Sequence, residues 1–382
     1  MSKYKRSLVI VLTCLIGLLI FLVSQKSFLS NAPKDFSLSS KADLYIVKRH
    51  SISGFKLTKQ RAEQIVETKL PVIKGQVNTA VPARTIANRY LLFSEEGPPL
   101  GIEGKVISID FLEGKLRQFK TKDYAYSSSG ASKSYYFSSK ASSEGTFLAV
   151  FDKDLKQKDH FIFKDSLFIN NFSISGQSLY FTSVKAVKGG YQPFLVNVTI
   201  SPEGKLTLKS QEPLLNDPDY NYSFGGSLLK QNDFYAVVNG VRHKTSKEKF
   251  PAKELFHYHL SSKKKELIPL SDIAPFTIFD LDKDYLAIEH ESNDLGKLGF
   301  SLFNTKDKSS FFVDLGQLGI PFKNHRIKDI RRYDDKSILI LVGNTLLHYD
   351  ILNRELQSST QLSHKENEAL YIWVPAKSSK IS

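Results

Sequence analysis

TLLHYDILNRE, residues 345–355, decides the fold because its pattern recurs along the chain: an apolar run ends in a polar residue, and a polar turn follows. Apolar runs of this length, bounded by turn-forming residues, predict strands followed by tight turns. Six copies predict a repeat protein built from strands. Their closing pairs are Ile109-Asp110, Phe151-Asp152, Val198-Thr199, Tyr258-His259, Phe303-Asn304 and Tyr349-Asp350.

The spacing of the copies indicates what each repeat contains. Successive copies are 42, 47, 60, 45 and 46 residues apart, and the 240 residues from Asp110 to Asp350 average 48 per interval. Each interval also holds further strand-like runs, such as YLLF at residues 90–93. A four-stranded repeat of this length is typical of a β-propeller blade. Residues 84–362 thus resemble degenerate WD-type repeats, although Trp373 is the only tryptophan. The resemblance implies an architecture and no specific family.

The two ends of the repeat region predict how the ring closes. Residues 43–374 are long enough for about seven blades, and DLYIVKR (43–49) and ALYIWV (369–374) are strand-like. Pairing these two strands would leave no free sheet edge. We therefore predict an all-β, seven-bladed β-propeller with six complete repeats and one composite blade; six blades with N-terminal additions remain the alternative. One helix is expected, at 58–70, with Thr58 as its cap.

The N-terminus predicts a membrane anchor. SLVIVLTCLIGLLIFLVS, residues 7–24, is uncharged and apolar and follows Lys3, Lys5 and Arg6, which orient the N-terminus to the cytoplasm. A cleaved signal peptide is the alternative, but the sites for cleavage are poor. The predicted organisation is a cytoplasmic basic flank (1–6), a single-pass transmembrane signal anchor (7–24), a Ser-rich stalk (25–42), a propeller outside the cytoplasm (43–374) and a disordered tail (375–382).

Cysteine usage and charge limit the setting and the partners. Cys14 is the only cysteine and lies inside the anchor, so the exported part has no disulfides, which favours a bacterial cell envelope. Lys3, Lys5 and Arg6 supply three of the 14 net positive charges, which leaves +11 for the remainder. Outside the cell this charge excludes a nucleic-acid partner. It suits an anionic lipid surface, an anionic envelope polymer or an envelope protein complex.

FDLDKDYLAIEHE, residues 279–291, has the carboxylate spacing of a calcium loop at Asp280, Asp282, Asp284 and Glu291. The position that needs glycine is Tyr285, however, and polar turns stand at the same place in the other repeats. We therefore interpret the segment as a turn between the first and second strands of a blade.

Two histidines on one face of a predicted strand, His257 and His259 in FHYHL, have a spacing that zinc sites use. The repeat aligns His257 with His348, and no third ligand lies nearby in the sequence. We expect no metal and no cofactor. No P-loop, G-x-S-x-G or G-x-G-x-x-G motif is present, so the catalytic residues, if any, are unknown.

Blade geometry predicts where a ligand binds. In a four-stranded antiparallel blade, the loop between strands two and three and the link to the next blade emerge on one face. The long connections of this chain fall there, and they mix acids, histidines, arginines and aromatics. The candidate binding residues are Asp217, Asp219, Tyr220, Arg242, His243, His290, Glu291, His325 and Arg326.

The resulting hypothesis is a binding or scaffold subunit for an envelope or secretion complex, or a receptor for an anionic envelope polymer. A propeller hydrolase or lyase acting on envelope glycans is the alternative, and a spacer without a ligand is the third. A shallow basic or aromatic surface on the ligand face favours a binder, whereas two carboxylates with a perturbed histidine favour an enzyme.

Overall fold

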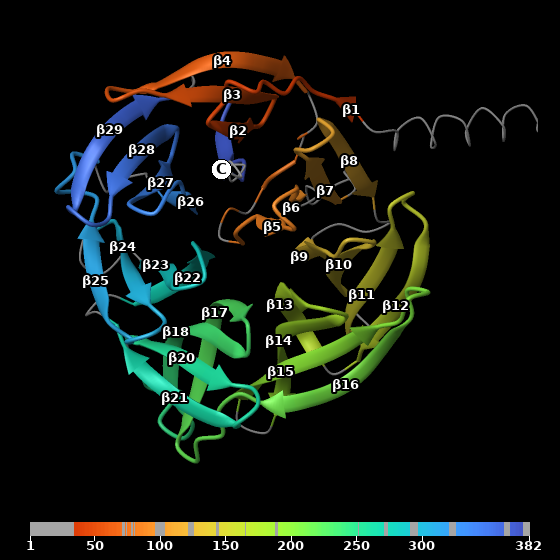
Figure 1. The fold of residues 1–382 in the computed structure, drawn as a ribbon. Helices are drawn as coiled ribbons and strands as arrows, with labels where there is room; N and C mark the ends of the chain where they lie inside the picture. Colours follow the sequence, from red (N-terminus) through yellow and green to blue (C-terminus); the bar gives the residue numbers. More distant parts are fainter. Residues whose placement is uncertain are drawn as a thin grey trace, which may run out of the picture.

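The structure is a computed structural model in which seven four-stranded units surround a central axis (Figure 1). It describes residues 34–70, 73, 75–77, 79, 81–95, 104–120, 126–142, 145–164, 166–187, 190–250, 252–270, 274–290, 297–320, 326–362 and 367–376.

Each blade is an antiparallel sheet, and the blades are numbered 1 to 7 here in the order in which the strands are given. The innermost strands are β5 (Arg84–Ile86), β9 (Tyr126–Ala131), β13 (Ser166–Ser175), β17 (Tyr220–Lys230), β22 (Pro275–Asp280), β26 (Ile327–Arg332) and β30 (Ala369–Trp373). The second strands are β6 (Tyr90–Glu95), β10 (Tyr135–Ser142), β14 (Ser178–Val187), β18 (Asp233–His243), β23 (Tyr285–His290), β27 (Ser337–Val342) and β2 (Leu44–Lys48).

The outer half of each blade follows the same order. The third strands are β7 (Lys105–Asp110), β11 (Gly145–Asp152), β15 (Gly190–Ile200), β20 (Glu254–His259), β24 (Gly299–Asn304), β28 (Thr345–Asp350) and β3 (Ser51–Leu57). The fourth strands are β8 (Lys115–Lys120), β12 (Gln157–Phe163), β16 (Leu206–Pro213), β21 (Lys264–Pro269), β25 (Ser310–Asp314), β29 (Glu355–Gln361) and β4 (Ala62–Lys69). Two short strands, β1 (Lys34–Asp35) and β19 (Lys249–Phe250), pair with β8 and β18.

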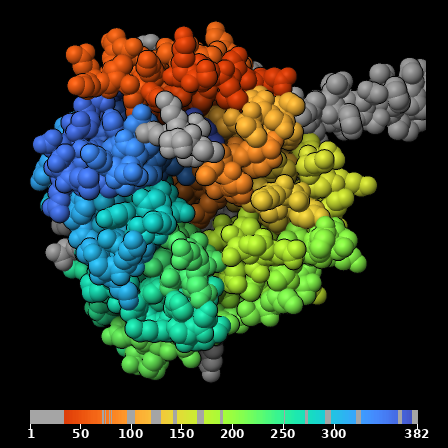
Figure 2. Space-filling model, in the orientation of Figure 1, coloured from red at the N-terminus to blue at the C-terminus, as the bar shows by residue number. Residues whose placement is uncertain are grey.

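Blade 7 closes the ring and confirms the predicted composite blade. β30 from the C-terminal end pairs with β2, with Tyr45 opposite Trp373 and Val47 opposite Tyr371. Trp373 then stacks on Phe111 of blade 1, with ring centroids 4.6 Å apart. The red N-terminal strands and the blue C-terminal strands accordingly lie side by side in Figure 2. Closure satisfies the backbone groups that an open sheet would leave at its edge.

The turn after each third strand explains the repeated polar residue. The Asp110 Oδ1 atom accepts the backbone N–H of Leu112 at 3.0 Å, and the Asp350 Oδ1 atom accepts that of Leu352 at 2.8 Å. One residue in each of these six turns has a positive φ, and only two of the six are glycines, so the sequence shows no glycine signature. They are Gly114, Leu155, Gly204, Lys263, Lys308 and Arg354.

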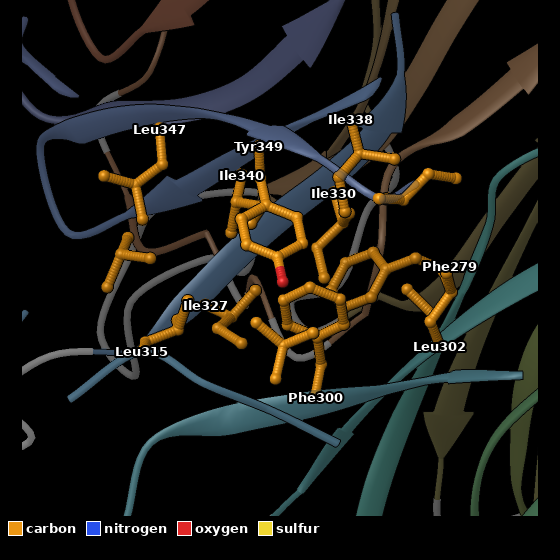
Figure 3. Close-up of a cluster of buried hydrophobic side chains, with 14 of the residues drawn as sticks. Phe279, Phe300, Leu302, Leu315, Ile327, Ile330, Ile338, Ile340, Leu347 and Tyr349 are labelled. Carbon is orange, nitrogen blue, oxygen red and sulfur yellow. The ribbon is translucent and has the colours of Figure 1, made fainter. Parts of the chain in front are cut away.

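The core lies between neighbouring blades. Figure 3 shows the cluster between blades 5 and 6, where Phe279, Phe300 and Leu302 face Ile330 and Ile340. All five are at most 2% exposed. Burying one such side chain stabilises the fold by about 1.5–3 kcal/mol. Because comparable clusters join blades 7 and 1 and blades 6 and 7, the ring is held together all round.

The prediction of a helix at residues 58–70 is wrong. Residues 62–69 form β4, which pairs with β3 along its whole length. Thr58 does act as a cap, but of a turn: its Oγ1 accepts the backbone N–H of Arg61 at 3.2 Å. The apolar residues of this segment recur with a weak helical period, but hydrogen bonding and packing against β3 favour a strand.

The propeller begins earlier than its predicted boundary at residue 43. Residues 34–42, assigned to the stalk by the sequence, lie against the propeller: β1 pairs with β8, and Phe36 is buried beside Phe111. The predicted anchor at 7–24 lies outside the described residues, as does tail segment 377–382.

Candidate functional site

The two faces of the propeller differ in their connections. The turns after first and third strands emerge on one face, called the turn face. The loops after second strands and the links between blades emerge on the other, called the loop face. The seven predicted binding residues that the structure describes lie in loop-face connections or at the strand ends beside them, but they do not form one site.

Five of the nine come together on blade 4, where β17 and β18 are each 11 residues long. β18 turns back through residues 244–248 into β19, and Arg242 lies opposite Lys249 in that hairpin. The Arg242 Nε atom donates to the carbonyl of Lys247 at 3.0 Å, and the His243 Nδ1 atom accepts the N–H of Ser246 at 3.0 Å. These bonds fix the tip of the hairpin.

The neighbouring link supports the hairpin. The Asp217 Oδ1 atom accepts the backbone N–H groups of Asp219 and Tyr220 at 2.8 and 2.9 Å. Burial alone would raise the pKa of Asp217, but these hydrogen bonds outweigh it and lower the pKa. The ring of Tyr220 packs edge-on against His243 and Phe250. Asp217, Asp219, Tyr220 and His243 therefore position the hairpin.

A cavity of about 380 Å³ lies beside this hairpin and is lined by aromatic, amide and basic side chains. Tyr191 is 58% exposed and Phe250 is 37% exposed, so both rings offer apolar surface to a ligand. The lining residues that the sequence had not selected include Tyr191, Asn221, Tyr222, Asn239, Lys247, Lys249 and Phe250. They come from β15, β17, β18, β19 and the turn before β19, so no local pattern in the sequence groups them.

His290 and Arg326 lie elsewhere on the loop face. His290 is 2% exposed, and its Nε2 atom hydrogen-bonds to the Ser301 hydroxyl at 2.7 Å, so it is an internal residue. Arg326 stacks over the ring of Phe276 at 4.6 Å, and its Nε lies 3.6 Å from Oε1 of Glu289. Glu291 and His325 lie outside the described residues.

Glu289 is a buried carboxyl group on this face, and its pKa is raised. It is 3% exposed, and burial raises its pKa to about 7 although Arg326 attracts the ionised form. Its Oε2 atom is buried without a hydrogen-bond partner among the described residues. The sequence did not predict a buried carboxyl group with a pKa near 7, because nothing local in it shows that the side chain at position 289 faces inward.

The predicted turn and strand roles of the other motifs are confirmed. The Asp282 Oδ1 atom accepts the N–H groups of Asp284 and Tyr285 at 2.7 and 2.9 Å, as a turn requires. His257 and His348 occupy equivalent third-strand positions. Each bonds the first residue of its second strand, at 2.7 Å to Asp233 and at 2.9 Å to Ser337.

A second and larger cavity, of about 520 Å³, opens on the turn face where innermost strands end. Its charged lining residues are Arg84, Lys230, Asp280, Asp282, Lys283, Arg331 and Arg332. Sequence reasoning missed it because four blades contribute these side chains. The available signal was a charged residue closing three first strands, at Lys230, Asp280 and Arg332.

Comparisons with known proteins support the fold and assign no family. No family model matches the chain, and no curated protein matches it. A solved protein from Bacteroides uniformis, provisionally named a 6-phosphogluconolactonase, is similar with a TM-score of 0.54 and 12% identity, over 86% of this chain and 99% of that one.

Two further solved structures are similar. A functionally unknown protein from Desulfotomaculum acetoxidans has a TM-score of 0.50 and 10% identity, over 82% of this chain and 93% of that one. The Pan2 WD40 domain of Neurospora crassa has a TM-score of 0.49 and 12% identity, over 76% and 82%. The likeness to solved proteins shows the fold alone, and the seven blades are those of the structure itself.

Within the described part of the chain, no helix is long and apolar enough to span a bilayer. Nor do three or more metal-ligating side chains gather there into a metal site.

Proposed function

We propose that the protein is a membrane-anchored binding protein of the bacterial cell envelope, and that its blade 4 hairpin holds an anionic envelope polymer. The observation that carries the proposal is the chemistry of the 380 Å³ cavity, where exposed Tyr191 and Phe250 lie with Arg242 and Lys249. Aromatic faces stack on sugar or polyol units, and the cations attract phosphate or carboxylate groups.

The surface meets the criterion for a binder more closely than that for an enzyme. The cavity is lined by basic and aromatic side chains, and none of the lining residues that the structure describes is a carboxylate or a histidine. Exposed lysine and arginine give diffuse attraction that salt weakens. Such a surface suits a repeating polymer better than a single small molecule.

The membrane-anchored part of the proposal rests on the sequence of residues 7–24. Full-length protein expressed in a bacterium should stay in the membrane pellet after carbonate washing, and protease added to spheroplasts should digest the propeller. Release by carbonate, or a propeller protected from external protease, would contradict the anchor and its orientation.

Binding is tested with the full-length protein in detergent micelles. Poly(glycerol phosphate) is the anionic probe and dextran the neutral one, with affinity followed by fluorescence anisotropy at several salt concentrations. We expect the anionic chain to bind and salt to weaken it. Changing Arg242→Gln and Lys249→Gln together should weaken binding about fivefold to twentyfold, since exposed ion pairs contribute up to about 1 kcal/mol each.

The matched control removes two exposed charges far from the hairpin. Arg61 immediately precedes β4, the outer strand of blade 7, and Lys209 lies on β16, the outer strand of blade 3. The Arg61→Gln, Lys209→Gln double variant has the same net charge as the hairpin variant and should bind within about twofold of the wild type. Equal loss in both double variants would show that only net charge matters. If dextran bound as tightly as poly(glycerol phosphate), the proposal that the ligand is anionic would be contradicted.

One observation favours the alternative, a hydrolase or lyase acting on envelope glycans: Glu289 combines a pKa of about 7 with a neighbouring arginine. Release of new chain ends from an acidic glycan by the wild type, but not by Glu289→Gln, would replace the binder with an enzyme. Equal behaviour of both proteins leaves Glu289 a buried structural residue.

A further inference from the structure

The 520 Å³ cavity on the turn face is built by residues from five blades. Lys230 closes β17, Asp280 closes β22, and Arg332 closes β26, while Arg84 opens β5 and Trp373 closes β30. Only a closed ring brings these strand ends together. The cavity therefore belongs to the central channel and is distinct from the blade 4 hairpin on the loop face.

Two arginines cross the channel at the base of this cavity. Arg84 of blade 1 donates from Nη2 to the carbonyl of Ser227 in blade 4, at 2.9 Å. Arg331 of blade 6 donates from Nη2 to the carbonyl of Ala83, beside blade 1, at 2.8 Å. Neither arginine bonds an adjacent blade in these contacts, so both guanidinium groups lie across the channel.

The charges lining the cavity are unbalanced. Five of its side chains are basic and two are acidic, which gives a net charge of +3. The Lys230 Nζ atom lies 2.8 Å from Asp280, and the Arg332 Nε atom lies 3.2 Å from Asp282. Both carboxylates of the lining are therefore already engaged.

A third carboxylate behind the cavity wall engages another of the basic groups. Arg331 lies 3.0 Å from Asp329, which is fully buried. Among the described residues, Arg84 and Lys283 have no carboxylate within ion-pair distance.

Two guanidinium nitrogens in the cavity are unsatisfied. Arg84 Nε and Arg332 Nη1 are buried and have no hydrogen-bond partner among the described residues. The pKa of Arg84 is lowered to about 10, chiefly by burial, with Asp280 raising it and Arg331 lowering it. Arg84 thus remains charged at neutral pH, and a buried guanidinium nitrogen without an acceptor is costly.

A purely structural role explains part of this arrangement. A cross-channel hydrogen bond accounts for Arg84 Nη2 but not for its Nε, and it gives no reason for Lys283, which is exposed at the rim. An anion in the cavity would offset the excess charge by contacting the exposed parts of the half-buried Arg84 and Arg332 side chains. Arginine forks are the usual partners of phosphoryl and carboxylate oxygens.

We propose that this cavity binds a compact polyanion, whose phosphoryl or carboxylate oxygens contact Arg84 and Arg332 and whose remaining charge is neutralised by Lys283. Once Asp329 is counted, Arg84 and Lys283 are the two basic lining residues without an ion-pair partner among the described residues, which calls for two negative charges on the ligand. Leu281, Ile372 and Trp373 form an apolar wall that can pack against an organic body. The same chemistry can be offered by a free small molecule or by the anionic end of a polymer.

The test is calorimetric titration of the full-length protein in detergent with pyrophosphate, citrate and, separately, a linear polyphosphate chain. We expect pyrophosphate or citrate to bind with one-to-one stoichiometry if the ligand is a free polyanion. Binding of polyphosphate alone would assign the site to a polymer. Arg84→Met should weaken binding about tenfold or more, because charge-assisted hydrogen bonds are lost.

Lys283→Gln keeps the test decisive if Arg84→Met does not fold. Lys283 is an exposed turn residue, and we expect about twofold to fivefold weaker binding. Lys336→Gln is its matched control, since Lys336 occupies the corresponding turn of blade 6 on the same face but does not line the cavity.

The wild type and Lys336→Gln should bind alike. No heat with any of the three anions would leave the arginines a purely structural role. Equal binding by Lys283→Gln and the wild type would contradict the placement of the anion in this cavity.

Discussion

The turn face and the loop face of this propeller hold their charges in opposite ways. In the turn-face cavity, Arg331 is 14% exposed in its side chain and is joined to blade 1 across the channel. On the loop face, Arg242 is exposed, and its Nε bonds the Lys247 carbonyl of the same hairpin. Arg331 is therefore tied to the fold, whereas Arg242 is exposed to a ligand. Substitutions at the two places should therefore separate stability from binding.

The largest expected difference is in stability. Arg331→Met would leave Asp329 as a buried carboxylate without its cation, and we expect the free energy of unfolding to fall by about 3–5 kcal/mol. Arg242→Met should lower it by less than about 1 kcal/mol. Urea unfolding of the two full-length variants, followed by tryptophan fluorescence, measures both. Equal losses would mean that the two faces do not differ in the way described.

A pH-dependent difference of intermediate size is expected at Glu289. The folded pKa of about 7 lies above the unfolded value, so the folded protein binds a proton that the unfolded chain releases. Stability from this group is present below about pH 4.5 and is lost as the pH rises through 7. Between pH 4.5 and 8 the wild type should lose about 2–3 kcal/mol relative to Glu289→Gln.

Glu203→Gln is the control for that series. Glu203 lies in a turn where the Ser201 hydroxyl lowers its pKa, so its contribution changes only at lower pH. Relative to Glu203→Gln, the stability of the wild type should stay constant above pH 5. A constant difference for Glu289→Gln as well would show that Glu289 is ionised throughout.

Phe250→Ala separates binding from stability on the loop face. The ring is 37% exposed and packs edge-on against Tyr220. We expect unfolding free energy to fall by about 1 kcal/mol or less, while affinity for poly(glycerol phosphate) falls about tenfold through lost apolar contact with the polyol chain. Fluorescence anisotropy measures the affinity and urea unfolding measures the stability of the same sample. A large stability loss with unchanged affinity would reverse the assignment of this ring.

The smallest expected effect is on the stability of the two turn lysines. Lys283→Gln and Lys336→Gln should each change the free energy of unfolding by less than about 0.5 kcal/mol, because both side chains are exposed. A rise in melting temperature on adding pyrophosphate should be smaller in Lys283→Gln alone. Identical rises in both variants would place the anion outside the cavity.

The fold could be predicted because its signals are local and repeated. Asp110 and Asp350 cap equivalent turns, and one strand from each end of the chain completes blade 7. The turn-face cavity could not be predicted, because Arg84 and Ser227 meet only after the ring has closed. The strand at 62–69 was mistaken for a helix, since its partner strand was not visible in the local pattern.

The predicted binding residues on the loop face could be placed only in part from the sequence. Arg242 lies in β18 and Asp217 in the link that leads into β17, so both belong to blade 4 or its border. The sequence correctly assigned both residues to the loop face. His290, however, is internal, and only the packing of blade 5 reveals it. A polar residue at a strand end has the same appearance in the sequence whether it faces solvent or the interior.

The most direct test of two separate binding faces is hydrogen exchange of the full-length protein, measured with pyrophosphate and with poly(glycerol phosphate) in turn. Pyrophosphate should slow exchange in residues 82–88, 279–285 and 331–335, and the polymer should slow it in residues 240–250. Protection of the same segments by both ligands, or of neither set by either ligand, would contradict the account.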